Sequence, residues 1–221
     1  GHISDPRSAS LLAIHAHGIP VDFPEAALEQ ARNPKPAPAE REDLTQIPLI
    51  TIDPHDARDH DDAVYAEQLD DGWRVIVAIA DVAAFVTPDS PLDREALKRG
   101  NSTYFPDRVV LREGELRRCM AVEMIFDKAG TKRSHRFIRG MMKSAAKLSY
   151  EEAQAAIDGK PGGKAEEMLE PVLKPLWGAY AALAEARDRR SPLDLDLPER
   201  RILFTEEGEI DGIITKERLE A

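Results

Sequence analysis

The twelve residues from Thr51 to Asp62 constrain this chain more than any other stretch, because five of them are aspartates. The five are Asp53, Asp56, Asp59, Asp61 and Asp62. An apolar run over residues 47–52 precedes them and a second extended run begins at Ala63, so they lie between two predicted strands. Neighbouring carboxylates raise one another's proton affinity, and a folded chain must offset their charge. Mg²⁺ prefers oxygen ligands, so the stretch predicts a metal site at a strand end.

Two other interpretations of this acidic stretch compete with a magnesium site. Runs of charge are usually solvated, so the stretch can also be an exposed acidic loop. A calcium-binding loop would need the pattern Asp-x-Asp-x-Asp-Gly with a closing glutamate, and that pattern is absent. Judged from composition alone, the metal site and the solvated loop are about equally supported.

Composition places the chain among globular proteins. The length of 221 residues suits one large domain or one and a half, and 42% of the residues are hydrophobic, which is enough for a core. It contains neither a run of about eighteen apolar residues nor a signal-peptide pattern, so we expect a soluble, cytoplasmic protein. Cys119 is the single cysteine, which excludes an internal disulfide, and we expect it to be a small buried apolar residue. Gly1-His2 is typical of a tag remnant, so we expect a segment of a longer protein.

The net charge of -11 argues against nucleic-acid binding, but its distribution does not. Between Lys132 and Lys147 the chain has six basic residues and no acidic one. They are Lys132, Arg133, Arg136, Arg139, Lys143 and Lys147. Such a basic stripe can guide a phosphate backbone even on an acidic protein. The alternative, an ordinary charged strand face, is about equally supported by the residues.

The hydrophobic pattern predicts an α/β (α+β) fold with a mixed, largely antiparallel sheet flanked by helices. The predicted helices cover residues 4–18, 24–32, 89–100, 149–159 and 166–190. The third ends in Gly100, the fourth begins with the capping box Ser149-Tyr-Glu-Glu152, and the last has a break near Pro175. The predicted strands cover 63–68 and 73–80 as a hairpin with Asp71-Gly72 in its turn, and 118–126, 134–142, 193–204 and 210–214. A proline-rich connector over 33–39 precedes the acidic stretch. Asp81 ends a predicted strand, where a capping or turn role is favoured over metal ligation.

Three sequence motifs resemble the ribonuclease II/ribonuclease R (RNB) family of exoribonucleases. The first is Thr-Ile-Asp-Pro-x-Asp-Ala-x-Asp-x-Asp-Asp-Ala from residue 51. The second is Arg-Gly-Asn-Ser-x-Tyr-Phe-Pro-Asp-Arg over 99–108, and the third is Asp-Leu-Asp-Leu-Pro-Glu over 194–199. One departure is the direct junction of Val110 and Leu111, where the family usually carries an additional segment. The resemblance implies residues 1–45 as a lead-in and residues 46–221 as a partial RNB-type catalytic domain.

The resemblance implies a Mg²⁺-dependent exoribonuclease, with Mn²⁺ as a possible substitute, that degrades single-stranded RNA from its 3′ end to nucleoside 5′-monophosphates. By motif position the family aspartates fall on Asp53, Asp59, Asp61 and Asp62. Asp53 and Asp62 would be the main metal ligands. Asp59 and Asp61 would also act in catalysis, Asp59 by orienting a water and Asp61 by positioning the attacking water or a second ion.

The loop over residues 101–108 is the predicted contact with RNA. Tyr104 lies between Arg99 and Arg108 in the sequence, and an aromatic ring beside basic groups suits a stacked base and its phosphate. An aromatic residue in a loop more often covers the core. The resemblance favours RNA binding, because the family's tyrosine stacks on the 3′-terminal nucleotide. We therefore predict RNA contacts for Tyr104, Arg99 and Arg108.

The family pattern also implies that the parent protein extends beyond this chain. Cold-shock domains would precede it and further helices with an S1 domain would follow it, so we expect these residues alone to be an inactive monomer with no membrane contact. Two other functions stay open: a catalytically silent RNA-binding relative, and a metal-dependent phosphohydrolase of small substrates. A Mg²⁺-dependent RNA cleavage assay tests for the silent relative, and loss of the salt-sensitive RNA affinity expected of a phosphate-contacting protein would favour the phosphohydrolase.

Overall fold

The computed structural model describes residues 14–18, 20–55, 57, 60–100, 113–191, 193, 200–205 and 210–215. The chain divides into two compact units, each assembled from separate segments of the sequence. The first comprises Gly1–Pro36, Phe85–Thr103 and Asp194–Arg218, and the second comprises Ala37–Ala84, Tyr104–Leu193 and Leu219–Ala221. Among the described helices, none combines the length and the apolar character that crossing a bilayer requires.

The described part of the first unit includes the helices α2 (Glu25–Arg32) and α3 (Pro91–Arg99) and the hairpin of β8 (Arg200–Phe204) with β9 (Ile210–Thr215). The Gln30 side chain joins the helices, because its amide oxygen accepts from the Leu92 N–H at 3.0 Å. Helix α3 begins where Ser90 accepts from the Asp93 N–H and ends at Gly100, whose φ of 75° is left-handed. The predicted helices over 24–32 and 89–100 and the final hairpin are confirmed.

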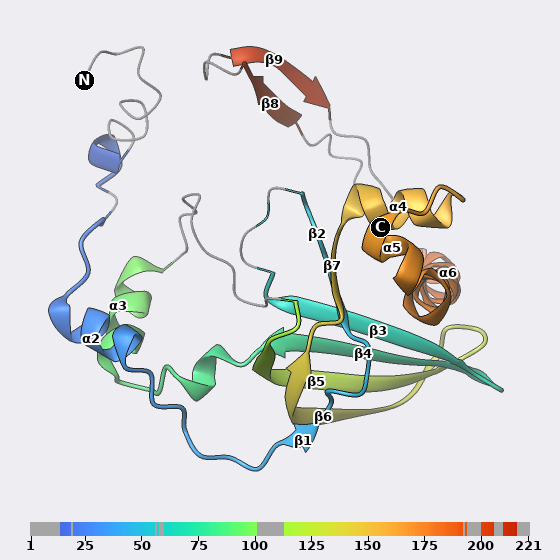
Figure 1. Ribbon diagram of the computed structural model, residues 1–221, viewed down its shortest axis with the longest axis horizontal. Helices are drawn as coiled ribbons and strands as arrows, with labels where there is room; N and C mark the ends of the chain where they lie inside the picture. Colours follow the sequence, from blue (N-terminus) through green and yellow to red (C-terminus); the bar gives the residue numbers. More distant parts are fainter. Residues whose placement is uncertain are drawn as a thin grey trace. The chain divides into compact units, whose positions relative to one another are not determined.

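The second unit is built on a seven-stranded mixed sheet with the order β1-β6-β5-β4-β3-β2-β7 (Figure 1). The strands are β1 (Glu42–Asp43), β2 (Ile50–Asp53), β3 (Asp62–Leu69), β4 (Gly72–Ala80), β5 (Leu116–Asp127), β6 (Lys132–Lys143) and β7 (Ala146–Ser149). Neighbours from β2 through β3, β4 and β5 to β6 are antiparallel. The β1–β6 and β2–β7 pairs are parallel. The predicted fold class, a mixed and largely antiparallel sheet with helices, is confirmed.

The β3–β4 hairpin forms where it was predicted, but its turn differs in detail. The two loop residues are Asp70 and Asp71, and Gly72 is already the first residue of β4. A Cβ atom on Gly72 would lie 2.0 Å from the Phe126 carbonyl oxygen on β5. Gly72 is therefore required by the close approach of two strands, a contact that a local turn pattern does not contain.

The two faces of the sheet bury separate cores, because side chains alternate along each strand. On β4, Ile76 and Ala78 join one core, whereas Trp73 and Val75 join the opposite one. The first core also holds the fully buried Leu49. Truncation of such a leucine to alanine typically costs about 2–5 kcal/mol, so close packing in this core contributes substantially to the stability of the unit.

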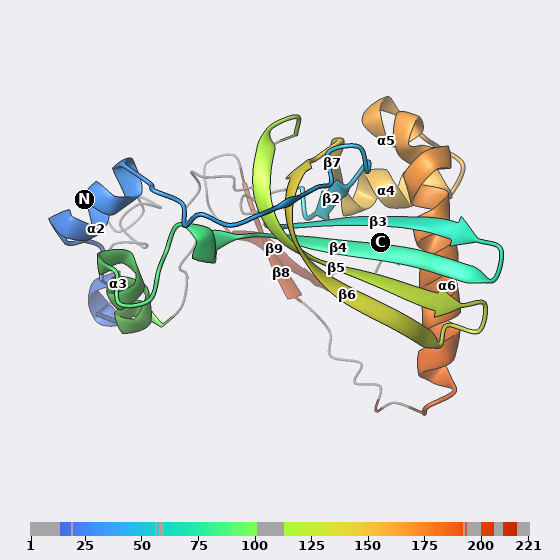
Figure 2. The same ribbon diagram turned by 90° about the horizontal axis from the view of Figure 1, so that it is seen from below.

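Helices α4 (Tyr150–Ile157), α5 (Gly163–Met168) and α6 (Lys174–Asp188) cover the second face. Figure 2 shows α6 along one side of the sheet, with α4 and α5 beside it. Ser149 and Glu152 form the predicted capping box: the Ser149 hydroxyl accepts from the Glu152 N–H, and the Glu152 carboxylate accepts from the Ser149 N–H. The predicted break near Pro175 is a π-helical segment, Leu169–Leu173, directly before α6.

Two predictions lie partly or wholly outside the described residues. Of the helix predicted over residues 4–18, the structure describes a helical turn at 14–16. The junction of Val110 with Leu111 is outside the described part of the chain.

Candidate active site

Asp53 ends strand β2, which lies between β3 and β7 in the sheet. Ile50 pairs with Val64 of β3, and Asp53 itself lies opposite Ser149 of β7. The Asp53 residue is 9% exposed, so its carboxylate faces mostly protein rather than water. A carboxylate in such a position needs a nearby donor or cation to offset its desolvation.

Asp62 begins strand β3 and lies at the same end of the sheet as Asp53, because β2 and β3 are antiparallel neighbours. The Asp61 carbonyl oxygen accepts from the Ala80 N–H at 2.7 Å, which fixes the backbone just before β3 against the end of β4. Asp61 and Asp62 are both exposed. Asp59, also predicted as a metal and catalytic residue, and Asp56 lie outside the described residues.

Tyr150 is the first residue of α4 and directly follows Ser149, which lies opposite Asp53. Burial raises the pKa of the Tyr150 hydroxyl, and the negative charges of Asp53 and Asp62 raise it further. In the sequence, Tyr150 is recognisable only as a residue of the capping box. Its nearness to Asp53 arises because the preceding residue, Ser149, pairs with that aspartate across β2 and β7.

His60 is a second residue of this region that the sequence reasoning missed. Its side chain is fully buried, and its Nδ1 lies 2.5 Å from Asp53 Oδ2. The other ring nitrogen, Nε2, is buried without a hydrogen-bond partner in the described structure. The position of His60 between Asp59 and Asp61 in the acidic stretch could have indicated this role from the sequence. Carboxylates that bind a metal are commonly hydrogen-bonded themselves, and an imidazole N–H can be the donor.

Asp81 belongs to the framework, as predicted, and not to the carboxylate group. Its Oδ2 accepts from Arg41 Nη2 at 2.6 Å, and both side chains are buried. Its Oδ1 accepts from the Ala84 N–H at 3.2 Å and caps the 3₁₀ turn Val82–Ala84. The predicted capping role is confirmed.

Cys119 also belongs to the framework. It is fully buried beneath Gly140, and burial raises the pKa of its thiol to about 11. The prediction that Cys119 is a small buried apolar residue is confirmed.

The carboxylate oxygens at this end of the sheet are the type of donor that a hard divalent cation prefers. Asp53 and Asp62 offer them from the neighbouring strands β2 and β3. Within the described ranges, no group of three histidine, cysteine, aspartate or glutamate side chains has the geometry of a complete metal site. The assignment of Asp53, Asp59, Asp61 and Asp62 as metal ligands therefore stays a prediction.

The described part of the predicted RNA-binding set is Arg99. Its guanidinium donates to the Glu95 carboxylate and to the carbonyl oxygens of Pro20 and Asp22, at 2.6–2.8 Å. It also stacks 3.7 Å from the centre of the Phe23 ring. Arg99 thus links α3 to residues 20–23 in this structure. Tyr104 and Arg108 lie outside the described residues, so RNA contacts for these three stay predictions.

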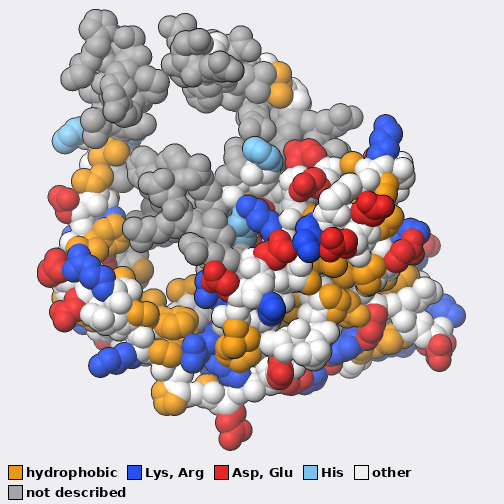
Figure 3. All heavy atoms as spheres, viewed as in Figure 1, with side chains coloured by type: hydrophobic (Ala, Val, Ile, Leu, Met, Phe, Trp, Pro, Cys, Tyr) orange, Lys and Arg blue, Asp and Glu red, His pale blue; other side chains and the backbone are white. Residues whose placement is uncertain are grey.

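The basic stripe has two parts in the structure. Arg133 pairs with Asp127, and Arg136 bridges Glu42 and Glu123. These two arginines therefore behave as an ordinary charged strand face, the alternative to a phosphate-guiding stripe. Lys132, Arg139, Lys143 and Lys147 are exposed and form no ion pair with a described residue. On the face shown in Figure 3, acidic and basic side chains are interspersed, so the net charge of -11 does not gather in one place there.

Comparison with known proteins defines the class to which this arrangement belongs. Residues 41–221 match the model of the RNB domain, so the chain belongs to the RNB family. Ribonuclease R of Vibrio parahaemolyticus is 38% identical over 230 residues, which cover 94% of this chain and 27% of that relative. The chain therefore spans about a quarter of the length of that relative.

Two solved structures share the fold. That of Mycoplasma genitalium RNase R in complex with ribose methylated single-stranded RNA matches with a TM-score of 0.88 at 23% identity, over 99% of this chain and 37% of that one. Yeast Ssd1, a pseudonuclease, matches with a TM-score of 0.57 at 17% identity, over 76% of this chain and 22% of that one. The same fold thus occurs with and without nuclease activity, and side chains must decide between them.

Proposed function

We propose that this chain is part of a Mg²⁺-dependent exoribonuclease that hydrolyses single-stranded RNA from the 3′ end to nucleoside 5′-monophosphates. The observation that carries the proposal is that Asp53 and Asp62 lie at the same end of the neighbouring strands β2 and β3 in an RNB-family chain. Homology to ribonuclease R supports an exoribonuclease. The remaining details, the direction, the product and the ion, belong to the proposal. They concern the parent protein, whose RNB-type domain would here begin near residue 46 and which would work in the cytoplasm.

Asp53 and Asp62 would bind the cation, with Asp59 and Asp61 completing the site. His60 would position Asp53 by donating Nδ1–H to Oδ2, which leaves Oδ1 for the cation. Mg²⁺, or Mn²⁺ in its place, would lower the pKa of a bound water and neutralise charge on the phosphate. Exposed Asp61, with its backbone fixed to β4, would hold the attacking water in line with the scissile bond.

Replacement of Asp61 by asparagine in the parent protein tests the proposal. Asp61→Asn removes one charge and little volume, so RNA affinity should stay near that of the wild type while Mg²⁺-dependent release of mononucleotides falls at least about a hundredfold. The matched control is Asp71→Asn, which removes an exposed charge from the β3–β4 turn of the same unit. Equal turnover by the Asp61 variant would refute the assignment.

The catalytically silent alternative makes a different prediction for the same assay. A silent relative would bind RNA but release no mononucleotide at any Mg²⁺ concentration, with or without Asp61. The intact aspartates favour the active enzyme, whereas the fold alone, shared with a pseudonuclease, favours neither. We expect the 221 residues without the rest of the parent to bind RNA and not to degrade it.

A further inference from the structure

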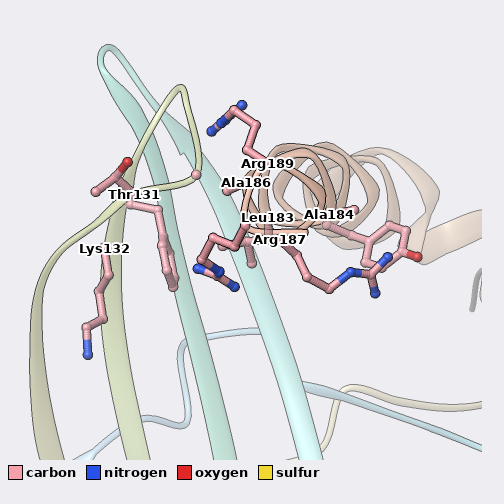
Figure 4. A pocket seen from close by; sticks show the side chains of 11 residues that line it. Thr131, Lys132, Leu183, Ala184, Ala186, Arg187 and Arg189 are labelled. Carbon is pink, nitrogen blue, oxygen red and sulfur yellow. The ribbon is translucent and has the colours of Figure 1, made fainter. Parts of the chain in front are cut away.

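A cavity of about 640 Å³ lies between α6 and the turn that joins β5 to β6 (Figure 4). From the turn and β6, Thr131 and Lys132 line it, and from α6 come Leu183, Ala184, Ala186 and Arg187. Phe126, Gly130, Tyr180, Arg189 and Arg190 complete the lining. All of these residues belong to the second unit, so the cavity is formed within one compact body.

The lining of this cavity is strongly basic. Four of its residues are cationic, Lys132, Arg187, Arg189 and Arg190, and none is acidic. The chain as a whole has a net charge of -11, so this concentration of positive charge runs against its composition. A concave surface lined by one sign of charge concentrates ligands of the opposite sign.

Aromatic and apolar surface accompanies these charges. Tyr180 is 44% exposed although it is a large side chain, and Phe126 and Leu183 are partly buried beside it. Basic groups around an exposed ring suit a base that stacks while its phosphates contact the cations. A simple anion would need the cations but not the ring.

The helix end alone does not account for the arrangement. Cations in the last turn of α6 favourably oppose the helix dipole, and Arg187 and Arg189 pair with Asp188 and Glu185. Lys132 comes from another element, across the cavity, and forms no ion pair with a described residue. Lys132 of β6 and the arginines at the end of α6 line the same cavity, so a bound polyanion could contact cations from both elements.

We propose that this cavity binds a segment of single-stranded RNA, with phosphates on Lys132 and Arg187 and one base on Tyr180. The proposal rests on the proposed function for its choice of polyanion. Phe126 lies opposite Trp73, next to the β3–β4 turn, whereas Asp62 begins β3 at its other end. Seven residue steps along β3 span about 23 Å. The cavity is thus a separate contact, at least about seven stacked nucleotides from the aspartates at about 3.4 Å each.

Binding of a labelled oligouridine of more than about ten nucleotides to the 221-residue chain, over a range of salt and without divalent cations, tests this cavity. Lys132→Gln with Arg187→Gln removes two phosphate contacts, so the slope of log affinity against log salt should decrease by about 1.4, at about 0.7 per contact. Tyr180→Ala should weaken binding roughly tenfold with an unchanged slope. Arg189 is left intact because it also donates to the Ala129 carbonyl oxygen.

The matched control is Lys164→Gln, which removes an exposed lysine from α5 in the same unit and should change neither quantity. Circular dichroism checks that each variant is folded. An unchanged slope in the folded Lys132/Arg187 variant overturns the proposal. So does displacement of the RNA by polyglutamate at equal charge concentration, because the cavity would then be a site for acidic polypeptides.

The two proposals can fail separately. If the parent protein releases no mononucleotides but the cavity variants lose salt dependence, the catalytic proposal falls and the RNA-binding cavity stands. If the parent degrades RNA and the cavity variants bind as the wild type does, the cavity proposal alone falls.

Discussion

Replacement of Arg41 by methionine should destabilise the second unit strongly. The Arg41 guanidinium lies 2.6 Å from Asp81 Oδ2, and the two side chains are only 8% and 7% exposed. It also donates to the carbonyl oxygens of Cys119 and Gly140, at 3.4 and 3.3 Å, so it links the segment before β1 to β5 and β6. Methionine preserves most of the volume but leaves the Asp81 carboxylate buried without its partner. Loss of one partner of a buried ion pair costs about 3–5 kcal/mol.

This cost can be measured by urea denaturation followed by tryptophan fluorescence. Both tryptophans, Trp73 and Trp177, lie in the second unit, so the signal reports on that unit. A loss of about 3–5 kcal/mol corresponds to a fall in melting temperature of about 6–20 °C for a protein of this size.

The control for this experiment is Lys174→Met, which breaks an exposed pair with Glu170 and should cost less than about 1 kcal/mol. A second variant, Arg41→Met with Asp81→Asn, removes the unpaired charge and keeps an oxygen for the Ala84 N–H. It should regain part of the lost stability. If Arg41→Met costs no more than Lys174→Met, or if the double variant is less stable than the single one, the reasoning is refuted.

Three further predictions follow from individual contacts. Ser149→Ala removes one half of the capping box and should lower the free energy of unfolding by about 1 kcal/mol in urea denaturation, whereas Ser149→Asp should restore most of it. His60→Gln in the parent should raise the Mg²⁺ concentration for half-maximal RNA hydrolysis about 10–100-fold, and an unchanged requirement would exclude the positioning role. Because burial raises the pKa of Cys119 from 9.0 to about 11, the unfolded chain ionises first as pH rises, and stability should fall above pH 9.0. Comparison of denaturation curves for wild type and Cys119→Ala over that range measures this effect, and equal pH dependence would contradict it.

The basic stripe over residues 132–147 shows that a run of cations in the sequence does not determine which of them are neutralised in the fold. Six cations without an acidic neighbour in the sequence suggested one surface for a phosphate backbone. In the fold, acidic residues from distant segments neutralise Arg136, because Glu42 lies 94 residues away in sequence and Glu123 on the adjacent strand. Lys132, the first residue of the same strand, instead lines a cavity together with Arg187 of α6. Sequence spacing therefore located the cations but not their partners.

Local signals predicted the elements well because local contacts specify them. The capping box at Ser149, the helix end at Gly100 and the break before Pro175 each depend on residues within one or two turns. The hairpin at Leu69–Gly72 was predicted for the same reason. The need for glycine at position 72 was assigned to the turn, whereas it arises from a carbonyl oxygen of β5, more than fifty residues away.

The acidic motif by itself determined which side chains bear the proposed chemistry and where the strands around them begin and end. Both properties depend on residues that are close together in the sequence. Only the tertiary structure decided that β2 lies between β3 and β7, which brings Ser149 and Tyr150 beside Asp53. It alone joined Arg41 to Asp81 and buried His60 against a carboxylate. Such contacts form between segments that are far apart in sequence, or depend on which groups lose water on folding. A local sequence pattern contains information about neither.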